Sequence, residues 1–550
     1  MTTPGVTEGL QLDENRDVVA EAAQEAADVE TLRPGQRKAV EAALVRDTIA
    51  VLATGTGKTA IYETVGYLID GPTLVISPTI ALQRDQVQTL IEHGFPTVSI
   101  SSANSEKVRR EGLEAFAAGQ VEMLLLAPEQ LGNPDVLEQV ELGRPSLIVV
   151  DEAHCVSEWG HSFRPDYLLI GSVVERLGHP RVLALTATAA PRVRRDIAER
   201  LSMRDPAVVV GNVDRPEIWL GARLFAGNRE RDEALVDAAV GVDGAVIVYA
   251  PTRRRCSELA AALASAGRPA EVYHAGLPMK QRRQTSDGFL SGRAQTVVAT
   301  NAFGMGVDRP DVRAVLHAGP PTSVDEYYQE VGRAARDGRP GRAELFFRLE
   351  DFALGRYLEA GGGVGEEDLR GVVEVLIEAD GALSRAEVEQ RSGLNRRRVA
   401  QVVGVLVAVD ALKRARGGGL HLRVAAERDP KGVVRKVLAD RDRRREFDRS
   451  RLDMIRAYAE TTDCRRRVVL ELLGEDYPER CLHCDNCDAG TSEEAADRPF
   501  PIGSRVTHAQ WGQGTVSHYE GDRVVVLFTD AGYRTLALGL VREKGLLSAA

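Results

Sequence analysis

The sequence predicts an α/β fold with two tandem parallel-sheet lobes, followed by smaller modules. Short apolar runs alternate with helical stretches over residues 31–210, and the same alternation returns over 211–360. Such alternation is typical of βαβ units, in which helices cover both faces of a parallel sheet. At 550 residues the chain is also too long for a single hydrophobic core. We therefore expect two similar lobes that can hold a ligand between them.

Each lobe contains a series of predicted strands. They lie at 48–53, 73–77, 97–101, 123–127, 147–150 and 182–186 in the first lobe, and at 245–249, 270–273, 296–299, 314–316 and 343–348 in the second. A Gly-rich stretch at 361–364 ends the second lobe. Residues 1–30 carry eight acids against one arginine, which predicts a disordered or loosely helical acidic leader.

Charge is distributed unevenly along the chain. The formal net charge of -11 argues against a protein that coats nucleic acid through global charge, but local basic patches can still bind phosphates. One such patch lies at 391–416, where seven basic residues outnumber a single acid for a net +6. The patch is either a nucleic-acid contact or a solvated helix face.

Several classes of protein are excluded by composition. No apolar run approaches the roughly 18–20 residues of a membrane span, and the N-terminus lacks the pattern of a secretory signal. Six cysteines are too few for a disulfide scaffold of this size. We expect a soluble, cytoplasmic protein without a membrane partner.

A phosphate loop is predicted at residues 52–59, Leu-Ala-Thr-Gly-Thr-Gly-Lys-Thr, between a strand and a helical run. In that context backbone N–H groups and the helix N-terminus bind phosphates, Lys58 reaches the outer ones, and Thr59 can ligate Mg²⁺. Leu52 replaces the first Gly of the strict pattern, so an incidental Gly-rich turn is the alternative. The predicted nucleotide contacts here are Thr54, Gly55, Thr56, Gly57, Lys58 and Thr59.

Two carboxylates follow the phosphate loop by about ninety residues, in Asp151-Glu152-Ala153-His154. They end the apolar strand 147–150, where Asp151 can reach Mg²⁺ and Glu152 can orient the attacking water. The tetrapeptide is weak alone, but it is specific at this distance from a phosphate loop.

Further motifs appear in the order found in superfamily 2 helicases, which this chain resembles. They are 32–36 before the phosphate loop, 185–189 at the end of the first lobe, and 329–336 in the second. The resemblance implies two RecA-like lobes with ATP between them. Arg333 and Arg336, offered by one lobe to a nucleotide held by the other, would couple hydrolysis to lobe closure. A surface arginine pair is the alternative.

The stretch 154–167, His-Cys-Val-Ser-Glu-Trp-Gly-His-Ser-Phe-Arg-Pro-Asp-Tyr, resembles the aromatic-rich loop of RecQ helicases. In that family the loop senses single-stranded DNA and couples it to ATP hydrolysis. The resemblance implies DNA contacts by Trp159, Phe163, Arg164 and Tyr167, since exposed aromatics stack on bases.

The spacing of these aromatics also fits a helical core stripe, because they fall at i, i+4 and i+8. Gly160 and Pro165 make a continuous helix unfavourable. Glu158 departs from the Gln usual in the family.

Other stretches resemble RecQ proteins at 273–277, 299–308 and 327–330. By this resemblance Gln36 reads adenine, with Arg33 beside it as a further nucleotide contact. Ala335 replaces the Gly usual between Arg333 and Arg336.

Four cysteines predict a zinc site. Cys464 is followed after sixteen residues by Cys481, Cys484 and Cys487 at two tight spacings, and four thiolates can enclose Zn²⁺ in a tetrahedron. A reducing cytoplasm favours metal over disulfides. The same spacing marks the RecQ zinc module, here at 429–490. His483 is expected to be a neighbour and not a ligand, and Cys155 and Cys256 to be packing residues.

The segment 361–428 departs from the RecQ order, in which the zinc module follows the motor directly. Three predicted helices at 366–380, 384–393 and 395–409 precede a hairpin at 411–423, which is a winged-helix pattern. The third helix opens with Asn395 and the arginines Arg396, Arg397 and Arg398, where a recognition helix would meet DNA. The alternative is a spacer whose arginines are solvated or paired with Glu387 and Glu389.

The C-terminal residues 501–550, after an acidic linker at 491–500, predict a small β-barrel. The stretches 503–508, 511–516 and 524–528 resemble the Tudor-like barrel that ends UvrD-type helicases. Those barrels are linked to protein partners, including RNA polymerase. A structural cap without a partner is the alternative.

These observations predict an ATP-dependent DNA helicase that uses ATP, Mg²⁺ and Zn²⁺. The RecQ resemblance implies 3′–5′ translocation on single-stranded and duplex or forked DNA, in repair or recombination. A DEAH-type RNA helicase rests on the shared tetrapeptide alone. A non-catalytic DNA-binding adaptor conflicts with the intact Lys58, Asp151, Glu152, Arg333 and Arg336.

Overall fold

The computed structural model describes most of the chain, in two compact units. The described residues are 17–53, 55–78, 80–101, 104–157, 164–211, 213–304, 307, 309–352, 364–379, 381–408, 411–414, 419–423, 430–475, 477, 479–492, 499–500, 504–520, 522–528 and 531–549. The first unit comprises Met1–Asp351 with Met454–Ala550, and the second comprises Phe352–Asp453.

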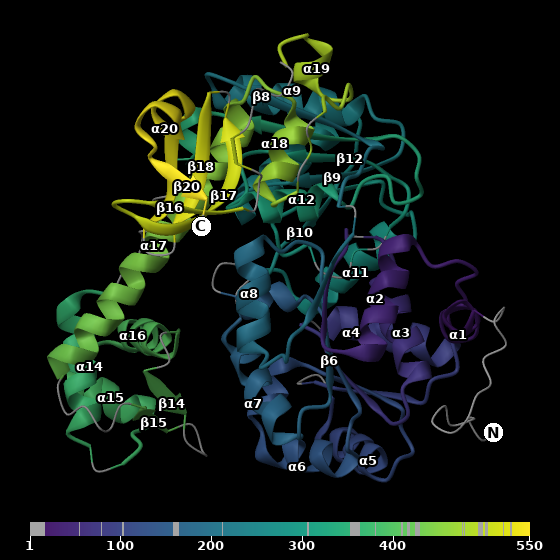
Figure 1. Cartoon of the computed structure of the whole chain (residues 1–550), viewed down its shortest axis with the longest axis vertical. Helices are drawn as coiled ribbons and strands as arrows, with labels where there is room; N and C mark the ends of the chain where they lie inside the picture. The colour runs from purple at the N-terminus through teal and green to yellow at the C-terminus, as the bar shows by residue number, and fades with distance from the viewer. Residues whose placement is uncertain are drawn as a thin grey trace. The chain divides into compact units, whose positions relative to one another are not determined.

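The first lobe contains a seven-stranded parallel sheet of order β3-β4-β2-β5-β6-β1-β7. Figure 1 shows the helices of this lobe around the sheet. Its strands are β1 (Thr48–Val51), β2 (Thr73–Ile76), β3 (Thr97–Ile100), β4 (Met123–Leu126), β5 (Leu147–Val150), β6 (Arg181–Thr186) and β7 (Ala207–Val210). The central strands β1, β2 and β5 are buried along their whole length because helices cover both faces of a parallel sheet. Six of these strands were predicted, and β7 was not.

The first lobe begins earlier in the chain than residue 31, because helix α1 already belongs to it. Its helices are α1 (Val18–Ala27), α2 (Pro34–Val45), α3 (Lys58–Leu68), α4 (Ile80–Glu92), α5 (Glu106–Ala117), α6 (Pro134–Gly143), α7 (Leu169–Arg176) and α8 (Pro191–Arg200). Helix α1 lies in the predicted acidic leader, yet its alanines at 23, 26 and 27 belong to the core of this lobe. A loose leader is therefore the wrong description of 18–27.

The second lobe is a six-stranded parallel sheet of order β10-β11-β9-β12-β13-β8. It contains β8 (Ile218–Leu224), β9 (Ala245–Tyr249), β10 (Glu271–Tyr273), β11 (Thr296–Ala299), β12 (Val312–His317) and β13 (Gly341–Phe347). Its helices are α9 (Asn228–Val240), α10 (Arg253–Ser265), α11 (Met279–Leu290) and α12 (Val324–Val331). The edge strand β8 was not predicted.

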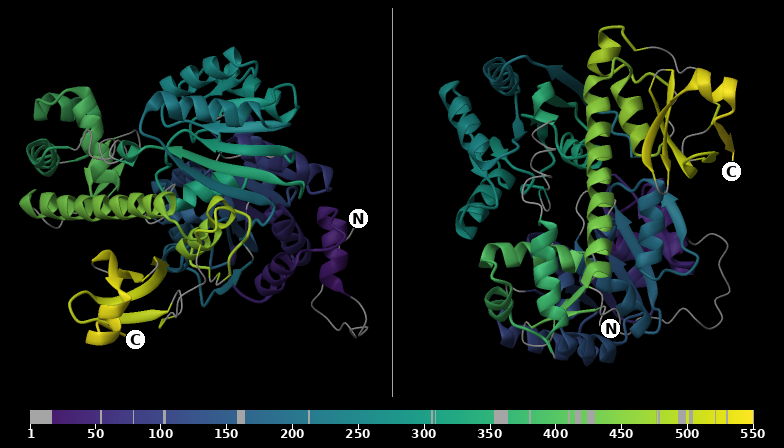
Figure 2. Two further views of the ribbon diagram at one scale, coloured as in Figure 1. Left: turned by 90° about the horizontal axis from the view of Figure 1, so that it is seen from above. Right: turned by 90° about the vertical axis from the view of Figure 1, so that its left-hand side faces the viewer.

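The second unit has three helices and an antiparallel strand pair, in the order that the sequence predicts. They are α14 (Glu366–Ile377), α15 (Arg385–Ser392), α16 (Arg396–Ala408), β14 (Leu412–Arg414) and β15 (Leu420–Leu422). Leu383 bridges to Leu420 beside this pair. Residues Val434 and Val437 of α17 (Pro430–Glu460) complete its apolar core. Helix α17 is a single helix of 31 residues (Figure 2).

The rest of the first unit contains two small elements. Helices α18 (Arg465–Leu472) and α19 (Asp485–Asp488) follow α17 and carry the cysteine cluster. An antiparallel sheet of order β19-β18-β17-β16-β20 then ends the chain. It is formed by β16 (Arg505–His508), β17 (Gly512–Glu520), β18 (Arg523–Phe528), β19 (Gly532–Ala537) and β20 (Leu547–Ala549), with α20 (Leu538–Lys544) between the last two. Among the described residues, no helix combines the length and the hydropathy needed to cross a bilayer.

Candidate nucleotide site and zinc module

The phosphate loop turns the chain from β1 into α3. Gly55 and Gly57 have φ of +78° and +75°, the left-handed region that glycine adopts without strain. Helix α3 begins at Lys58, so its N-terminal N–H groups face the same loop. Thr59 is half-buried in the first turn. Thr54 lies outside the described residues.

Gln36 is buried against the phosphate loop. Its Nε2 donates to the carbonyl oxygens of Thr56 at 2.7 Å and Gly57 at 2.9 Å. Its Oε1 accepts the N–H of Arg33 at 2.8 Å, which closes the first turn of α2. In this arrangement Gln36 fixes the loop that would hold the phosphates, and its expected contact with adenine stays a prediction.

Asp151 lies at the carboxyl end of β5 and is held from several sides. Gln86 Nε2 donates to its Oδ2 at 3.0 Å, and the N–H of Glu152 donates to its Oδ1 at 2.9 Å. Burial and the neighbouring Glu152 charge raise the pKa of Asp151 to about 6, against a lowering by Lys58. A buried carboxyl of this kind is suited to a cation that offsets its charge.

Lys58 shows that the site fits a phosphate. Its Nζ is buried and has no hydrogen-bond partner among the residues that the structure describes. A buried ammonium without a partner is costly unless a ligand supplies the acceptor. Thr59 and Asp151 are the residues that would hold Mg²⁺, and Lys58 would contact the outer phosphates.

His154 joins the Glu152 carboxylate to the end of β6. Its Nδ1 lies 2.9 Å from Thr186 Oγ1 and 3.3 Å from Glu152 Oε2. Thr186 Oγ1 in turn donates to the carbonyl of Thr188 at 3.0 Å. The two motifs at 151–154 and 185–189 therefore share one hydrogen-bond network, which the sequence does not reveal.

The two predicted arginines follow α12 in the second lobe. Arg333 is buried, and no described residue accepts a hydrogen bond from its Nε. A Cβ added at Gly55 would lie 3.2 Å from Arg336 Cδ, so the Arg336 side chain lies directly against the phosphate loop. A cavity of about 800 Å³ is lined by Arg33, Gln36, Gly55, Thr56, Arg215 and Arg336, among others. This cavity brings Arg33, Gln36, Gly55 and Thr56 of the first lobe together with Arg336 of the second, but Lys58, Asp151, Glu152 and Arg333 do not line it.

The structure corrects one residue of the aromatic loop. Tyr167 is fully buried, and its hydroxyl donates to the carbonyl of Asp151 at 3.0 Å. A ring with no exposed surface cannot stack on a base, so Tyr167 supports Asp151 instead of contacting DNA. Arg164 donates to the carbonyl of Pro78. Trp159 and Phe163 lie outside the described residues.

The four predicted cysteines lie together. Their Sγ atoms are all within 4.8 Å of one another, and Cys481 and Cys487 are 3.9 Å apart. Tetrahedral zinc with bonds of about 2.3 Å requires sulfurs about 3.8 Å apart. Backbone N–H groups also donate to three of the sulfurs, at 3.3 to 3.4 Å, which favours thiolates. The cluster therefore fits Zn²⁺ with cysteine ligands alone.

Two other expectations concern residues beside this cluster and the remaining cysteines. His483 offers its backbone N–H to Cys481 Sγ and is not part of the ligand cluster. Cys155 and Cys256 are both buried, as packing residues should be, and burial raises the pKa of each thiol.

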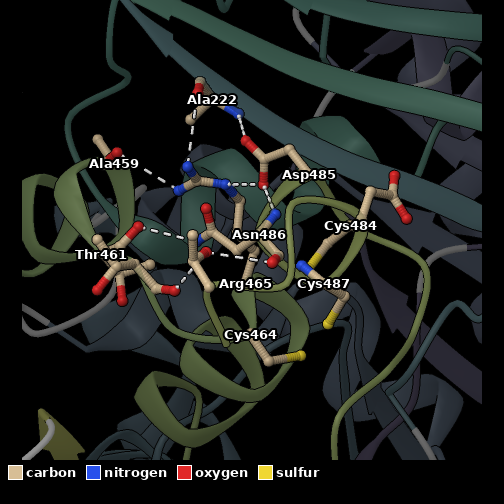
Figure 3. A network of polar contacts seen from close by, with 12 residues as sticks. Ala222, Ala459, Thr461, Cys464, Arg465, Cys484, Asp485, Asn486 and Cys487 are labelled. Carbon is tan, nitrogen blue, oxygen red and sulfur yellow. Dashed lines mark hydrogen bonds and ion pairs between the residues drawn. The ribbon is translucent and has the colours of Figure 1, made fainter. Parts of the chain in front are cut away.

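The zinc module is fastened to β8 by the residues between its ligands (Figure 3). Asp485 Oδ2 accepts the N–H of Ala222 at 2.9 Å, and its Oδ1 accepts from Arg465. Arg465 also donates to the carbonyl of Tyr458 at 2.8 Å. Asn486 Nδ2 donates to the carbonyls of Thr461 and Asp463. These contacts explain how the unpredicted edge strand β8 is covered.

The basic end of α16 only partly matches expectation. Arg396 is exposed, whereas Arg398 forms an ion pair with Asp368 of α14. Asn395 Oδ1 accepts the N–H of Arg398 at 2.9 Å and so caps this end of the helix. Arg398 therefore holds two helices together. The side chain of Arg397 lies outside the described residues.

The fold and the site define a two-lobed nucleoside triphosphatase of the helicase class. Residues 33–197 match the family model for DEAD/DEAH box helicases, 230–338 match the helicase conserved C-terminal domain, and 429–488 match RecQ zinc-binding. The chain is 38% identical to the probable ATP-dependent DNA helicase RecS of Bacillus subtilis, over 63% of this chain and 70% of that protein. It belongs to the RecQ family of ATP-dependent DNA helicases.

A second relative agrees with this assignment, and a solved structure shares the fold. ATP-dependent DNA helicase RecQ of Pasteurella multocida is 35% identical over 59% of this chain, which spans about half (51%) of that relative's length. The Mycobacterium smegmatis helicase Lhr bound to ssDNA and AMP-PNP has a TM-score of 0.50 at 21% identity, covering 77% of this chain and 62% of that one. The likeness to Lhr shows the fold alone.

Proposed function

We propose that the protein couples ATP hydrolysis to 3′–5′ translocation and duplex DNA unwinding, in DNA repair or recombination. The observation that carries this proposal is the buried Lys58 Nζ, which has no partner among the described residues and lies beside a buried Asp151. Such a site is costly to maintain without a charged ligand. The RecQ zinc-binding match makes DNA the favoured substrate.

The residues of the site have distinct roles in this proposal. Lys58 binds the outer phosphates, and Glu152 orients the attacking water. Arg333 and Arg336 stabilise the charge that develops on the transferred phosphoryl group. When bound at Thr59 and Asp151, Mg²⁺ neutralises charge on the phosphates. Because these residues come from both lobes, hydrolysis favours lobe movement, which is the basis of a motor.

DNA contacts are proposed at two places. Trp159, Phe163 and Arg164 in the aromatic loop bind single strands, since aromatic and guanidinium groups stack on bases. Segment 361–428 is proposed to be a winged-helix-like module whose α16 meets duplex or forked DNA through Arg396 and Arg397. The apolar core shared by its three helices and strand pair supports an independent module.

The C-terminal sheet at 501–550 is proposed to bind a protein partner through its aromatic cluster. The ring of Trp511 is stacked on His508 with centroids 4.2 Å apart, and Arg534 lies 5.9 Å above Trp511. Aromatic and arginine side chains are the commonest energetic centres of interfaces.

The cellular location follows from the proposed substrate. A DNA helicase acts where DNA is, so we propose a cytoplasmic, nucleoid-associated location.

Strand displacement tests the proposed function. ATPase and unwinding are measured on 3′-tailed, 5′-tailed and forked DNA, on a Holliday junction and on tailed RNA. We expect DNA-stimulated hydrolysis and unwinding of the 3′-tailed and forked DNA. The Lys58→Ala and Glu152→Gln variants should bind DNA but lose both activities. Equal or better unwinding of RNA would favour the DEAH-type RNA helicase instead.

A further inference from the structure

Arg215 is buried in the segment that leads from the first lobe into β8, and its guanidinium faces backbone carbonyls. One terminal nitrogen donates to the carbonyl of Gly332 at 2.9 Å. The other donates to Ala334 at 2.7 Å and Ala335 at 3.3 Å. These carbonyls belong to residues 332–336, the catalytic-arginine loop, which carries both Arg333 and Arg336. Arg215 thus contacts the backbone on which both arginines are mounted.

The catalytic-arginine loop needs such an external support. Helix α12 ends at Val331, so the carbonyls that follow are no longer paired in a helix. Ala335 has φ of +56°, a left-handed conformation that costs a residue with a Cβ about 1–2 kcal/mol. The loop therefore has a conformation that its own sequence disfavours and that surrounding contacts must maintain.

The zinc module fixes the segment that carries Arg215. Arg466, two residues after the zinc ligand Cys464, donates to Asp214 Oδ1 at 2.6 Å and to the carbonyl of Ile218. Arg466 is only 2% exposed. From the other side, the hydroxyl of Tyr328 in α12 donates to the carbonyl of Val213 at 2.9 Å. Segment 213–218 is thus held between α12 and α18.

We propose that Arg215 is a positioning residue for the catalytic-arginine loop, and that the zinc module holds Arg215 in place through the Arg466–Asp214 pair. The proposal rests on the proposed ATPase activity. It gives the zinc module a second task besides any contact with DNA: loss of its structure displaces Arg333 and Arg336. The effect on hydrolysis should then be seen without DNA.

A rival role for Arg215 is direct contact with the nucleotide, because it also lines the cavity. The two roles separate kinetically. A nucleotide contact supports binding, so its loss weakens nucleotide affinity and raises KM. A positioning role acts on the developing charge, so its loss lowers kcat while KM changes little.

The experiment uses the full chain with zinc bound, in the absence of DNA. Arg215→Gln and Arg215→Lys are compared by kcat, KM for ATP and the affinity for a fluorescent ADP analogue. Lysine keeps the charge but lacks the planar fork that contacts three carbonyls. Misplacement of a catalytic group by about 1 Å can cost up to about 100-fold, so we expect kcat to fall at least about tenfold in both variants, with KM within about threefold.

A control variant and two folding checks distinguish loss of the positioning role from unfolding of the protein. Arg229→Gln, an exposed arginine on α9, should behave as the unmodified protein does. Zinc content near one per chain and an unchanged melting temperature exclude unfolding; if Arg215→Gln fails these checks, Arg215→Lys carries the test. Native kcat in a folded variant, or a loss of affinity that matches the loss of kcat, overturns the positioning role. An inactive unmodified protein would instead overturn the proposed function.

The proposed link from the zinc module to Arg215 is tested by Asp214→Asn and by chelation of zinc. Asp214→Asn removes the charge that Arg466 contacts, and we expect a smaller fall in kcat with full zinc content. Chelation of zinc should lower the DNA-independent kcat of the unmodified protein but have little further effect in Arg215→Gln, because the two act on one loop. Multiplicative losses would show that zinc does not act through Arg215.

Discussion

The hydroxyl groups of Tyr327 and Tyr458 lie 2.9 Å apart in the protein interior, although the residues are 131 positions apart in sequence. Tyr327 belongs to α12, which leads into the catalytic-arginine loop, and Tyr458 belongs to the last turns of α17, shortly before Cys464. Both rings are fully buried, with centroids 4.8 Å apart. The pair is a second connection between the second lobe and the zinc module.

Removal of one hydroxyl should be more harmful than removal of both. Tyr458→Phe leaves the Tyr327 hydroxyl buried without this partner, which costs about 1–3 kcal/mol of unfolding free energy. The double variant Tyr327→Phe with Tyr458→Phe should recover part of that loss. Urea unfolding of the single and double variants measures the coupling. Simple additivity would mean that the two hydroxyls do not interact.

Glu63 should make the stability of the first lobe depend on pH. It lies on α3, buried, with His93 Nδ1 3.1 Å from its Oε1. Burial raises its pKa to about 7, against a smaller lowering by His93. The folded state therefore keeps a proton that the unfolded state releases above its ordinary value of 4.5. Stability from this group is present at low pH and is lost as pH rises through 7.

Glu63→Gln removes this penalty because the amide stays neutral. The variant should gain up to about 3 kcal/mol of unfolding free energy at pH 8.5, and less than half of that at pH 5. Thermal melts of both proteins from pH 5 to 8.5 measure the gap. A gap that is constant with pH, or that widens toward acid, would contradict the protonation of Glu63.

Cys484→Ser should lower bound zinc below one ion per chain. The substitution removes one of four thiolates, and a structural zinc site supplies much of the folding free energy of a small module. Elemental analysis after gel filtration measures the metal. Cys256→Ser, at a buried cysteine outside the cluster, is the matched control and should keep its zinc. Full zinc in Cys484→Ser would mean that another group completes the site.

The aromatic loop should divide into a DNA-sensing part and a supporting part. Trp159→Ala and Phe163→Ala should leave basal ATPase similar but flatten its stimulation by single-stranded DNA. Tyr167→Phe loses only the hydrogen bond to the Asp151 carbonyl and should lower basal ATPase without changing the fold stimulation by DNA. ATPase rate against strand concentration distinguishes these results. The same response from all three variants would contradict the division.

Only part of the basic end of α16 should contribute to DNA binding. Arg396→Ala with Arg397→Ala should reduce the slope of log affinity against log salt on duplex DNA by about two, at roughly 0.9 for each phosphate contact. Unwinding should fall more than DNA-stimulated ATPase. Arg398→Ala is the contrast, because it breaks the pair with Asp368 and should destabilise the module instead. An unchanged slope in the folded double variant would favour a spacer.

Site residues that belong to a recognisable sequence motif were predictable from the sequence. The phosphate loop, the carboxylates at 151 and 152 and the four cysteines each have a local pattern that chemistry dictates. Arg215 had no such pattern, because its function comes from carbonyls more than a hundred residues away. The replacement of glycine by Ala335 was visible in the sequence, but its left-handed backbone became clear only in the structure.

The errors in the sequence analysis also have physical reasons. Tyr167 was read as exposed because Gly and Pro interrupt the loop, yet the interruption returns the chain toward Asp151 and buries the ring. Strand β8 contains Trp219, Gly221 and Arg223 within seven residues, and this mixture hides a strand whose outer edge is covered by another module. Helix α1 was expected only as a loose helix or a disordered segment, and its packing into the core was missed, because small alanines between acids bury well without producing an apolar run.

The attachment of Asp485 to Ala222 sets an order of events during synthesis. The two residues are 263 positions apart, and a ribosome that adds about 5–20 residues per second needs roughly 10 to 50 s to make that stretch. Strand β8 lies at the end of its sheet beside β13, so it becomes an open sheet edge once β13 has been made and stays uncovered until Asp485 emerges. An open strand edge is a template for pairing with other chains. We therefore expect the newborn protein to be most prone to aggregation before the zinc ligands Cys481, Cys484 and Cys487 have emerged, and prompt zinc delivery to protect a lobe that was translated long before.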